Sequence, residues 1–128
     1  MPRLILRTGI DMLDISRLEE IDPKIRDRFM RRVYLPAELE SADGSFASLA
    51  GIFCVKEAVS KALGCGIGEI SWQDIETVAD SKGAPRVVLH GNAAHLADML
   101  GLTTWAVSIT HTRQTAAAAV TAVGMDTE

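Results

Sequence analysis

Charged side chains interrupt an otherwise apolar segment, FCVKEAVSKALGCGIGE, at residues 53–69. On a helix, residues three and four apart lie on one face, which would join the polar positions into one strip; they are Lys56, Glu57, Ser60 and Lys61. The strip raises the question of why an apolar helix carries this charge. The simpler interpretation is a solvated strip with an ordinary Glu57–Lys61 ion pair, which contributes only about 0.2–0.5 kcal/mol.

Glycine follows this predicted helix more often than a helix end requires. One glycine after Leu63 is enough for a left-handed cap, yet GCGIG keeps the backbone bare over residues 64–68. Chains do this where a ligand approaches the main chain closely. The dipole at a helix C-terminus does not favour an anion, so phosphate would need loop N–H groups and nearby lysines. By itself, the glycine-rich stretch is a weak signal.

Two other short stretches carry polar groups at the ends of predicted strands. In GIDMLDISRLEE, Asp11 ends a first strand at a sheet edge, and the simpler interpretation is an aspartate that turns the chain. In VSITHT, His111 and Thr112 lie where one strand is followed by the next. A single histidine in a turn carries little information.

The rest of the chain must position these groups. Strands are predicted at 4–12, 74–79, 85–90, 104–110 and 116–123. Helices are predicted at 16–21 (with Asp14 or Ser16 as cap), 24–33, 46–63 and 92–101, with a short helical piece from Pro36. Strands joined by short turns indicate an antiparallel sheet packed against the long central helix and the shorter helices. We therefore expect an α+β fold in a single domain over residues 1–128.

Composition limits the class of protein. The 128 residues carry a net charge of −4, which argues against general nucleic-acid binding. No apolar run has the roughly 20 residues that cross a bilayer, and Arg7 and Asp11 come too early for a signal-peptide core. Cys54 and Cys65 match no metal spacing and are expected to be reduced thiols. We expect a cytoplasmic protein without membrane contact.

Positive charge is concentrated in the segment from Lys24 to Arg32. Against one acidic residue, Asp27, it carries five basic ones, a balance of 5 − 1 = +4; they are Lys24, Arg26, Arg28, Arg31 and Arg32. A solvated helix face is one interpretation. The other is a docking site for an acidic partner, which charge complementarity would attract.

Taken together, GIDMLDISRLEE, FCVKEAVSKALGCGIGE and VSITHT, in this order, resemble the holo-[acyl-carrier-protein] synthases, the small class of 4′-phosphopantetheinyl transferases. The resemblance runs from about residue 5 to 123 and includes WQDIE and a GAP turn before a strand. Its specific part pairs G-x-D near the N-terminus with K-E-x-x-x-K-A in the middle. It implies the 4′-phosphopantetheinyl transferase fold.

The resemblance also implies an activity and its residues. The phosphopantetheine arm of coenzyme A would pass to a serine of an acyl carrier protein, of fatty-acid or polyketide type, leaving adenosine 3′,5′-bisphosphate. Asp11 and Glu57 match the family positions that hold Mg²⁺ on the pyrophosphate, an ion that takes carboxylate, phosphate and water oxygens. Lys61 matches a lysine beside the pyrophosphate, which would stabilise charge or help proton transfer.

Further positions match residues that contact coenzyme A; they are Gly64, Cys65, Gly66, Pro85, His111 and Thr112. The chain departs from the usual pattern elsewhere. Ile52 replaces an arginine associated with a coenzyme A phosphate, Ala84 a frequent lysine, Cys65 a threonine and Thr115 an aromatic residue. These departures leave a rival hypothesis open, a relative that binds coenzyme A or carrier protein without transfer.

The resemblance finally implies partners. Members of the small class are commonly homotrimers with active sites between subunits. Arg17 matches a position associated with carrier docking, and Arg28, Arg31 and Arg32 share a face at helical spacing. We therefore expect an acidic carrier protein to bind these four arginines.

Overall fold

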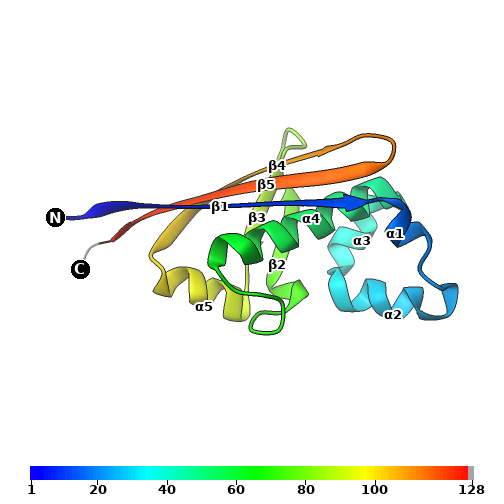
Figure 1. Cartoon of the computed structure of the whole chain (residues 1–128), viewed down its shortest axis with the longest axis horizontal. Helices are drawn as coiled ribbons and strands as arrows, with labels where there is room; N and C mark the ends of the chain where they lie inside the picture. The colour runs from blue at the N-terminus through cyan, green and yellow to red at the C-terminus, as the bar shows by residue number, and fades with distance from the viewer. Residues whose placement is uncertain (127–128) are drawn as a thin grey trace.

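A curved antiparallel sheet lies over the long helix α4 (Phe46–Leu63) and forms one layer of the molecule (Figure 1). The computed structural model describes residues 1–126, so the last two residues of the predicted domain lie outside the described residues. The sheet has the order β1-β5-β4, with the first and last strands of the chain paired from Arg3 with Asp126 to Asp14 with Thr115. Its strands are β1 (Arg3–Asp14), β4 (Leu102–His111) and β5 (Thr115–Asp126).

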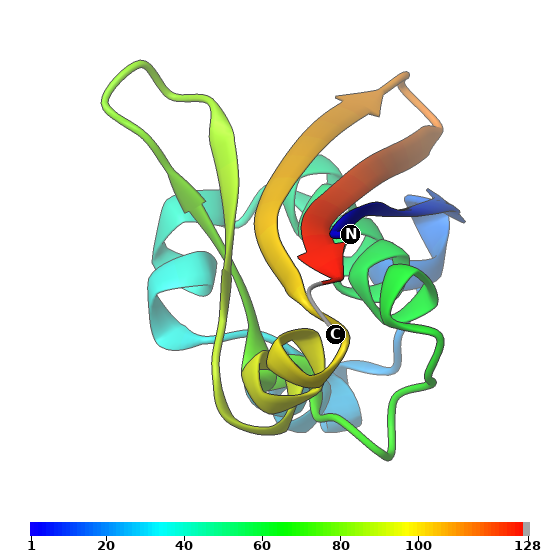
Figure 2. The ribbon, with the colours of Figure 1, turned by 90° about the vertical axis from the view of Figure 1, so that its left-hand side faces the viewer.

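A second, two-stranded sheet and the shorter helices complete the fold. The hairpin of β2 and β3 projects beside β4 (Figure 2). These elements are α1 (Ser16–Glu19), α2 (Pro23–Val33), α3 (Pro36–Ala42), the 3₁₀ turn η1 (Trp72–Asp74), β2 (Ile75–Ala79), β3 (Pro85–Leu89) and α5 (Gly91–Met99). The α+β class and the antiparallel pairing are confirmed, although the strands form two sheets rather than one.

Local differences from the sequence-based expectation are small. The strand predicted at 4–12 extends to Asp14, because pairing with β5 continues to Thr115. The strand predicted at 74–79 begins at Ile75, after the 3₁₀ turn. Neither Asp14 nor Ser16 caps α1; its N-cap is Ile15, without a side-chain hydrogen bond. The helix predicted at 92–101 ends at Met99, and Gly101 follows with φ +77°.

Burial alternates along β1 and decides which residues face the helices. Odd-numbered positions, including Gly9 and Asp11, face α4, whereas even-numbered positions remain exposed on the outer side of the sheet. The packing between β1 and α4 is closest at Gly9, where an added Cβ would lie 1.9 Å from the Ala58 carbonyl oxygen. The glycine of the G-x-D motif therefore sets how closely the strand carries Asp11 to the helix.

We expect Gly9→Ala to lower the free energy of unfolding by about 3 kcal/mol, because the carbonyl that the new methyl group meets is backbone and cannot turn aside. Gly66→Ala is the matched control. A Cβ at Gly66 has open space around it, so its effect should stay within about 0.5 kcal/mol. Urea unfolding of both variants measures the difference. Equal stability of the two variants would contradict the close approach.

Candidate active site

Two carboxylates and one lysine meet where β1 crosses α4. Lys61 Nζ lies 3.1 Å from Asp11 Oδ1 and donates a hydrogen bond to the Ile10 carbonyl at 2.8 Å. Glu57 lies one helical turn before Lys61, and burial together with the nearby Asp11 carboxylate raises the pKa of Glu57. The structure thus brings together Asp11, Glu57 and Lys61 from distant parts of the chain, as the family resemblance implies.

The electrostatics of this cluster favour a bound cation. Burial raises the pKa of Glu57 above its ordinary value, and the negative charge of Asp11 raises it further. Lys61 and Ser60 act in the opposite direction. Two carboxylates that repel each other, with one neighbouring ammonium group, fit the needs of Mg²⁺, which takes one or two carboxylates and completes its shell with phosphate and water oxygens. Within residues 1–126, no third acidic, histidine or cysteine side chain joins them to form a metal-binding group.

The raised pKa of Glu57 makes a prediction about stability. Its folded-state value exceeds the ordinary 4.5, so the folded protein binds more protons and loses stability as pH rises above 4.5 toward the raised pKa. Glutamine does not titrate, so the Tm of Glu57→Gln, relative to that of the wild type, should rise with pH. Because Glu57 is partly exposed, we expect a gain of only roughly 1–3 °C in Tm near neutral pH. Thermal unfolding in a metal chelator measures it; a gain that is larger at pH 4 than at pH 7 would contradict the assignment.

Cys54 lies on the Asp11 side of α4, one turn before Glu57, a proximity that the spacing of the cysteines does not indicate. Its thiol is fully buried, with Sγ 3.6 Å from the Ala116 carbonyl oxygen. Burial raises the pKa of Cys54 to about 12, and the carboxylate of Asp11 contributes to the rise. The thiol is therefore a neutral neighbour of the carboxylates and not a nucleophile. Cys54 and Cys65 are both free, which confirms the expectation of reduced thiols.

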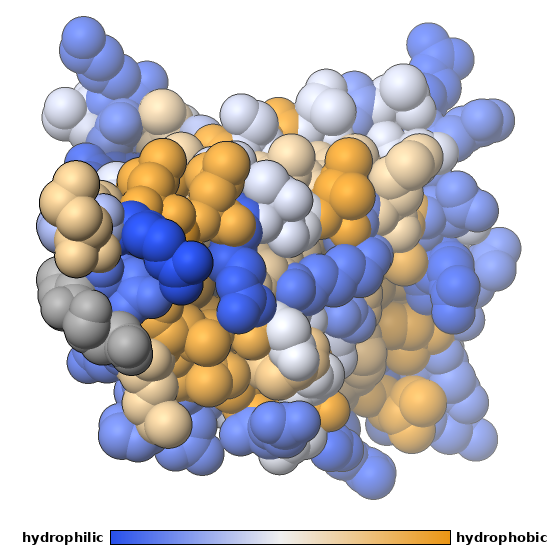
Figure 3. All heavy atoms as spheres, turned by 60° about the vertical axis from the view of Figure 1, so that its left-hand side comes forward, coloured by the Kyte–Doolittle hydropathy of each residue, from blue (hydrophilic) through white to orange (hydrophobic). Residues whose placement is uncertain are grey.

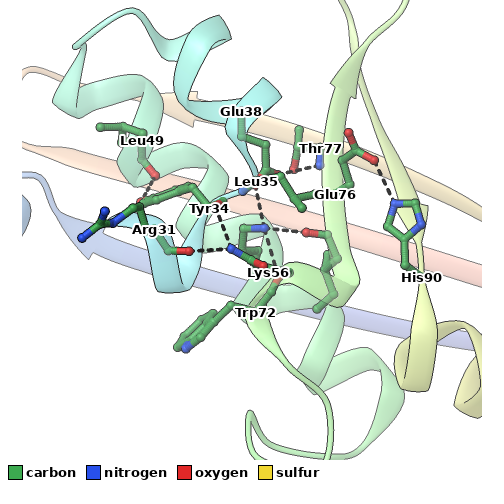
Figure 4. Close-up of polar contacts among 12 residues, drawn as sticks. Arg31, Tyr34, Leu35, Glu38, Leu49, Lys56, Trp72, Glu76, Thr77 and His90 are labelled. Carbon is green, nitrogen blue, oxygen red and sulfur yellow. Dashed lines mark hydrogen bonds and ion pairs between the residues drawn. The ribbon is translucent and has the colours of Figure 1, made fainter. Parts of the chain in front are cut away.

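The prediction of a single polar strip on α4 is wrong for two of its four residues. Lys56 is fully buried and forms an ion pair with Glu38 of α3, with Nζ and Oε1 2.8 Å apart (Figure 4). Ser60 is also buried, and its hydroxyl donates to the Glu57 carbonyl at 2.7 Å. Successive residues on a helix point about 100° apart, so Lys56 faces α3 and β2 while Glu57 faces the carboxylate cluster.

The glycine-rich loop begins one turn beyond Lys61. Gly64 ends α4 in the left-handed conformation with φ +75°, and the Cys65 N–H donates to the Ser60 carbonyl. At Gly66 the chain turns through open space, so local packing does not require a glycine there. Arg7, which is not among the predicted site residues, donates to the Ala62 carbonyl at 3.2 Å beside this loop. Its odd position on β1, two residues before Gly9, is the signal that could have found it.

A separate cavity of about 280 Å³ lies between α3, the start of α4, β4 and the β2–β3 hairpin. Among its lining residues, His111 is the single titratable side chain, and the others are small, apolar or hydroxyl-bearing; they are Ser41, Ala42, Ala47, Ser48, Ile52, Thr77, Val78, Ala79, Gly83, Pro85 and Ile109. The predicted contact residues Pro85 and His111 thus meet here, together with Ile52. Thr112 does not line the cavity, and its hydroxyl accepts from the N–H groups of Gln114 and Thr115 in the β4–β5 turn.

The carboxylate cluster and the cavity are separate within one chain. Asp11 lies on β1, at one edge of the sheet, and His111 lies on β4, at the other edge, with β5 between them. The lining of the cavity contains neither the cluster residues nor the loop at 64–66. Two strand spacings amount to about 10 Å, so the chain presents the carboxylate cluster and the cavity at opposite edges of the sheet.

The predicted docking arginines are exposed on two neighbouring helices. Arg17 lies on α1, and Arg28, Arg31 and Arg32 lie on α2. Arg26, also part of the basic segment, is held by the fold, since it donates to the carbonyls of Glu19 and Ile21 and stacks over the Phe46 ring. Ile25 is 48% exposed on α2, which adds an apolar contact to this basic surface.

The fold and the cluster agree with a family of known proteins. Residues 7–120 match the model of the 4′-phosphopantetheinyl transferase superfamily, so the chain belongs to that superfamily. Within the superfamily it is similar to the holo-[acyl-carrier-protein] synthases. The relative of that name from Moorella thermoacetica is 46% identical over 117 residues, which cover 89% of this chain and 91% of the relative.

Solved structures of the same kind superpose on nearly the whole chain. The holo-[acyl-carrier-protein] synthase of Helicobacter pylori, solved in complex with coenzyme A, is 34% identical with a TM-score of 0.81, covering 90% of this chain and 98% of its own. The Bacillus anthracis structure, in complex with CoA (3′,5′-ADP), is 32% identical with a TM-score of 0.76, covering 95% and 99%. The sequence-based recognition of the family is confirmed.

Proposed function

We propose that this chain is an active holo-[acyl-carrier-protein] synthase. It transfers the phosphopantetheine arm of coenzyme A to a serine of apo acyl carrier protein and releases adenosine 3′,5′-bisphosphate. The observation that carries this proposal is the meeting of Asp11, Glu57 and Lys61, the residues that match the family's signature, at one crossing of β1 and α4. Retention of all three favours an enzyme over the inactive relative.

In the proposed reaction, a bond forms between the serine oxygen and phosphorus, and the pyrophosphate linkage breaks. Asp11 and Glu57 would hold Mg²⁺, which supplies positive charge to the pyrophosphate when bound. Lys61 stands beside the same two carboxylates, and its ion pair with Asp11 favours a role in stabilising charge over one in proton transfer. The serine proton passes to a base, and none of Asp11, Glu57 and Lys61 is assigned that role.

The direct test uses purified protein, apo carrier protein, coenzyme A and Mg²⁺. Mass spectrometry of the carrier reads the added arm, and chromatography reads the nucleotide released. Addition of the arm together with adenosine 3′,5′-bisphosphate is expected, and chelation of the metal should stop it. Binding of coenzyme A without any modified carrier would favour the inactive relative.

A homotrimer would bring the carboxylate cluster of one chain next to the cavity of another. The outer side of the sheet exposes large apolar side chains on one edge strand, β1; they are Leu4, Leu6, Ile10 and Met12, each at least 60% exposed. Hydrophobic patches on the end of the molecule where β1 begins are visible in Figure 3. Exposed apolar surface on an edge strand favours a protein interface. Three copies, the number implied by the family resemblance, could set the carboxylates of one subunit against the cavity of the next.

Carrier docking by the arginines leads to a kinetic prediction. Arg28→Glu combined with Arg32→Glu should raise the KM for carrier protein roughly tenfold and leave the KM for coenzyme A unchanged, because exposed charges mainly guide encounter. Arg17→Glu should act in the same direction. The salt dependence of the carrier KM should fall as well, since screening acts over about 8 Å at physiological ionic strength.

The matched control makes the same change in net charge elsewhere. Lys82→Glu with Arg86→Glu alters two exposed residues at the β2–β3 hairpin, and the carrier KM should stay at the wild-type value. If the α2 variant changed both KM values equally, the arginines would be a solvated face.

A further inference from the structure

The buried ion pair between Lys56 and Glu38 has no part in the reaction described above. Both side chains are 0% exposed, which is costly for charged groups unless every polar atom finds a partner. Lys56 Nζ donates to the carbonyls of Trp72, at 3.1 Å, and Ile75 besides contacting Glu38. Glu38 accepts from the backbone N–H of Leu35 at 2.9 Å and from that of Thr77 at 2.8 Å (Figure 4).

These bonds connect the elements that form the cavity wall. Glu38 belongs to α3, whose last residues line the cavity, and Lys56 lies one helical turn after Ile52, which lines it from α4. On the other side, the pair holds backbone groups at the start of β2, including the N–H of Thr77, another lining residue. One ion pair therefore joins α3, α4 and β2 around a single space.

The partners of the pair are backbone atoms, and this separates it from ordinary core packing. Apolar side chains of similar volume would fill the same interior without the cost of burying charge. They would not fix the position of β2 along the helices, because dispersion contacts have little directionality. Hydrogen bonds to Trp72, Ile75 and Thr77 fix that position.

We propose that Glu38 and Lys56 are positioning residues for coenzyme A, and that they act by holding β2 as the wall of its nucleotide cavity. This inference rests on the proposed function, because it takes the cavity as the place where the nucleotide binds. The pair acts on binding and not on the transfer step, since Lys56 points away from Asp11 and toward α3.

The test compares coenzyme A binding by calorimetry with steady-state kinetics. Lys56→Met alone leaves a buried carboxylate without its partner and is expected to fold poorly. The informative variant is the double change Glu38→Gln with Lys56→Met, which removes both charges. Its Kd and KM for coenzyme A should rise about tenfold, which corresponds to about 1.4 kcal/mol of binding free energy, while kcat stays within about twofold.

Tyr34→Phe is the matched control. It removes a buried hydrogen bond of the same region, from the Tyr34 hydroxyl to the Leu49 carbonyl at 2.7 Å, without touching β2. It should lower Tm while leaving coenzyme A binding at the wild-type level.

A double variant that binds coenzyme A as tightly as the wild type would overturn the inference, as would a lower kcat with unchanged Kd. If the double variant fails to fold, Glu38→Asp applies the same test, because it keeps the charge and shortens the reach to the Thr77 N–H. Weaker binding supports the inference, and unchanged binding overturns it. A wild-type protein that binds no coenzyme A would overturn the proposed function and the inference together.

Discussion

Asp11→Ala and Glu57→Gln are each expected to lower the rate of phosphopantetheine transfer by roughly 100–1000-fold, the loss typical for removing one group that stabilises charge in a transition state. Either change leaves a single carboxylate at the cluster, which weakens the binding of Mg²⁺ against the pyrophosphate. Raising the Mg²⁺ concentration should recover part of the rate. Mass spectrometry of the carrier protein at several metal concentrations measures both effects.

Asp14→Ala is the matched control for these variants. Asp14 is exposed at the end of the same strand, and its carboxylate contacts only the Thr115 hydroxyl, at 3.4 Å, among the bonds described. Its activity should equal that of the wild type. Thermal unfolding checks that each inactive variant is folded. A near wild-type rate in either cluster variant would remove that residue from the metal site.

Mixing two inactive proteins is expected to restore activity. Glu57→Gln removes a carboxylate but keeps the cavity, whereas Ser48→Trp fills the cavity from the exposed start of α4 and keeps the carboxylates. If each active site takes its carboxylates from one subunit and its cavity from the next, equal mixing of trimers gives about one quarter of the sites intact. Transfer assays after co-refolding, or after co-expression, measure this fraction.

The alternative gives a different result, which makes the mixing experiment decisive. If one chain supplies the whole site, no mixed assembly contains an intact one, and activity stays at the level of the inactive parents. Light scattering on the same samples reports the assembly, and a monomer at micromolar concentration would exclude the homotrimer. Mixing Glu57→Gln with Asp11→Ala is the negative control, since both changes affect the carboxylate cluster and leave the cavity intact.

The sequence was sufficient to predict most of the elements, because they depend on local spacing, whereas the cluster was predicted from the family resemblance. The helix at 46–63 has the predicted bounds, and the G-x-D and K-E motifs predict carboxylates that the structure brings together. The roles of these residues in metal and coenzyme A binding stay predictions.

The position of Lys56 could not be predicted in the same way. A lysine next to a functional glutamate looks solvent-facing until its partner is known, and Glu38 lies 18 residues earlier on another helix. The separation of His111 from Asp11 is likewise a matter of strand order, which places β5 between their two strands. Tertiary contacts determine both the burial of Lys56 and the separation of His111 from Asp11, and propensity and periodicity do not encode such contacts.

The pairing of the first strand with the last has a consequence for the order of folding. β1 forms its ladder with β5, so Arg3 meets Asp126 and Asp11 meets Ala118 only after nearly the whole chain has left the ribosome. Contacts so distant in sequence form slowly, because a large loop must close first. Until then, the apolar side chains of β1 remain without a sheet and are prone to association with other chains. Asp11 is synthesised early but is fixed beside α4 late, so the carboxylate cluster is completed at the end of folding.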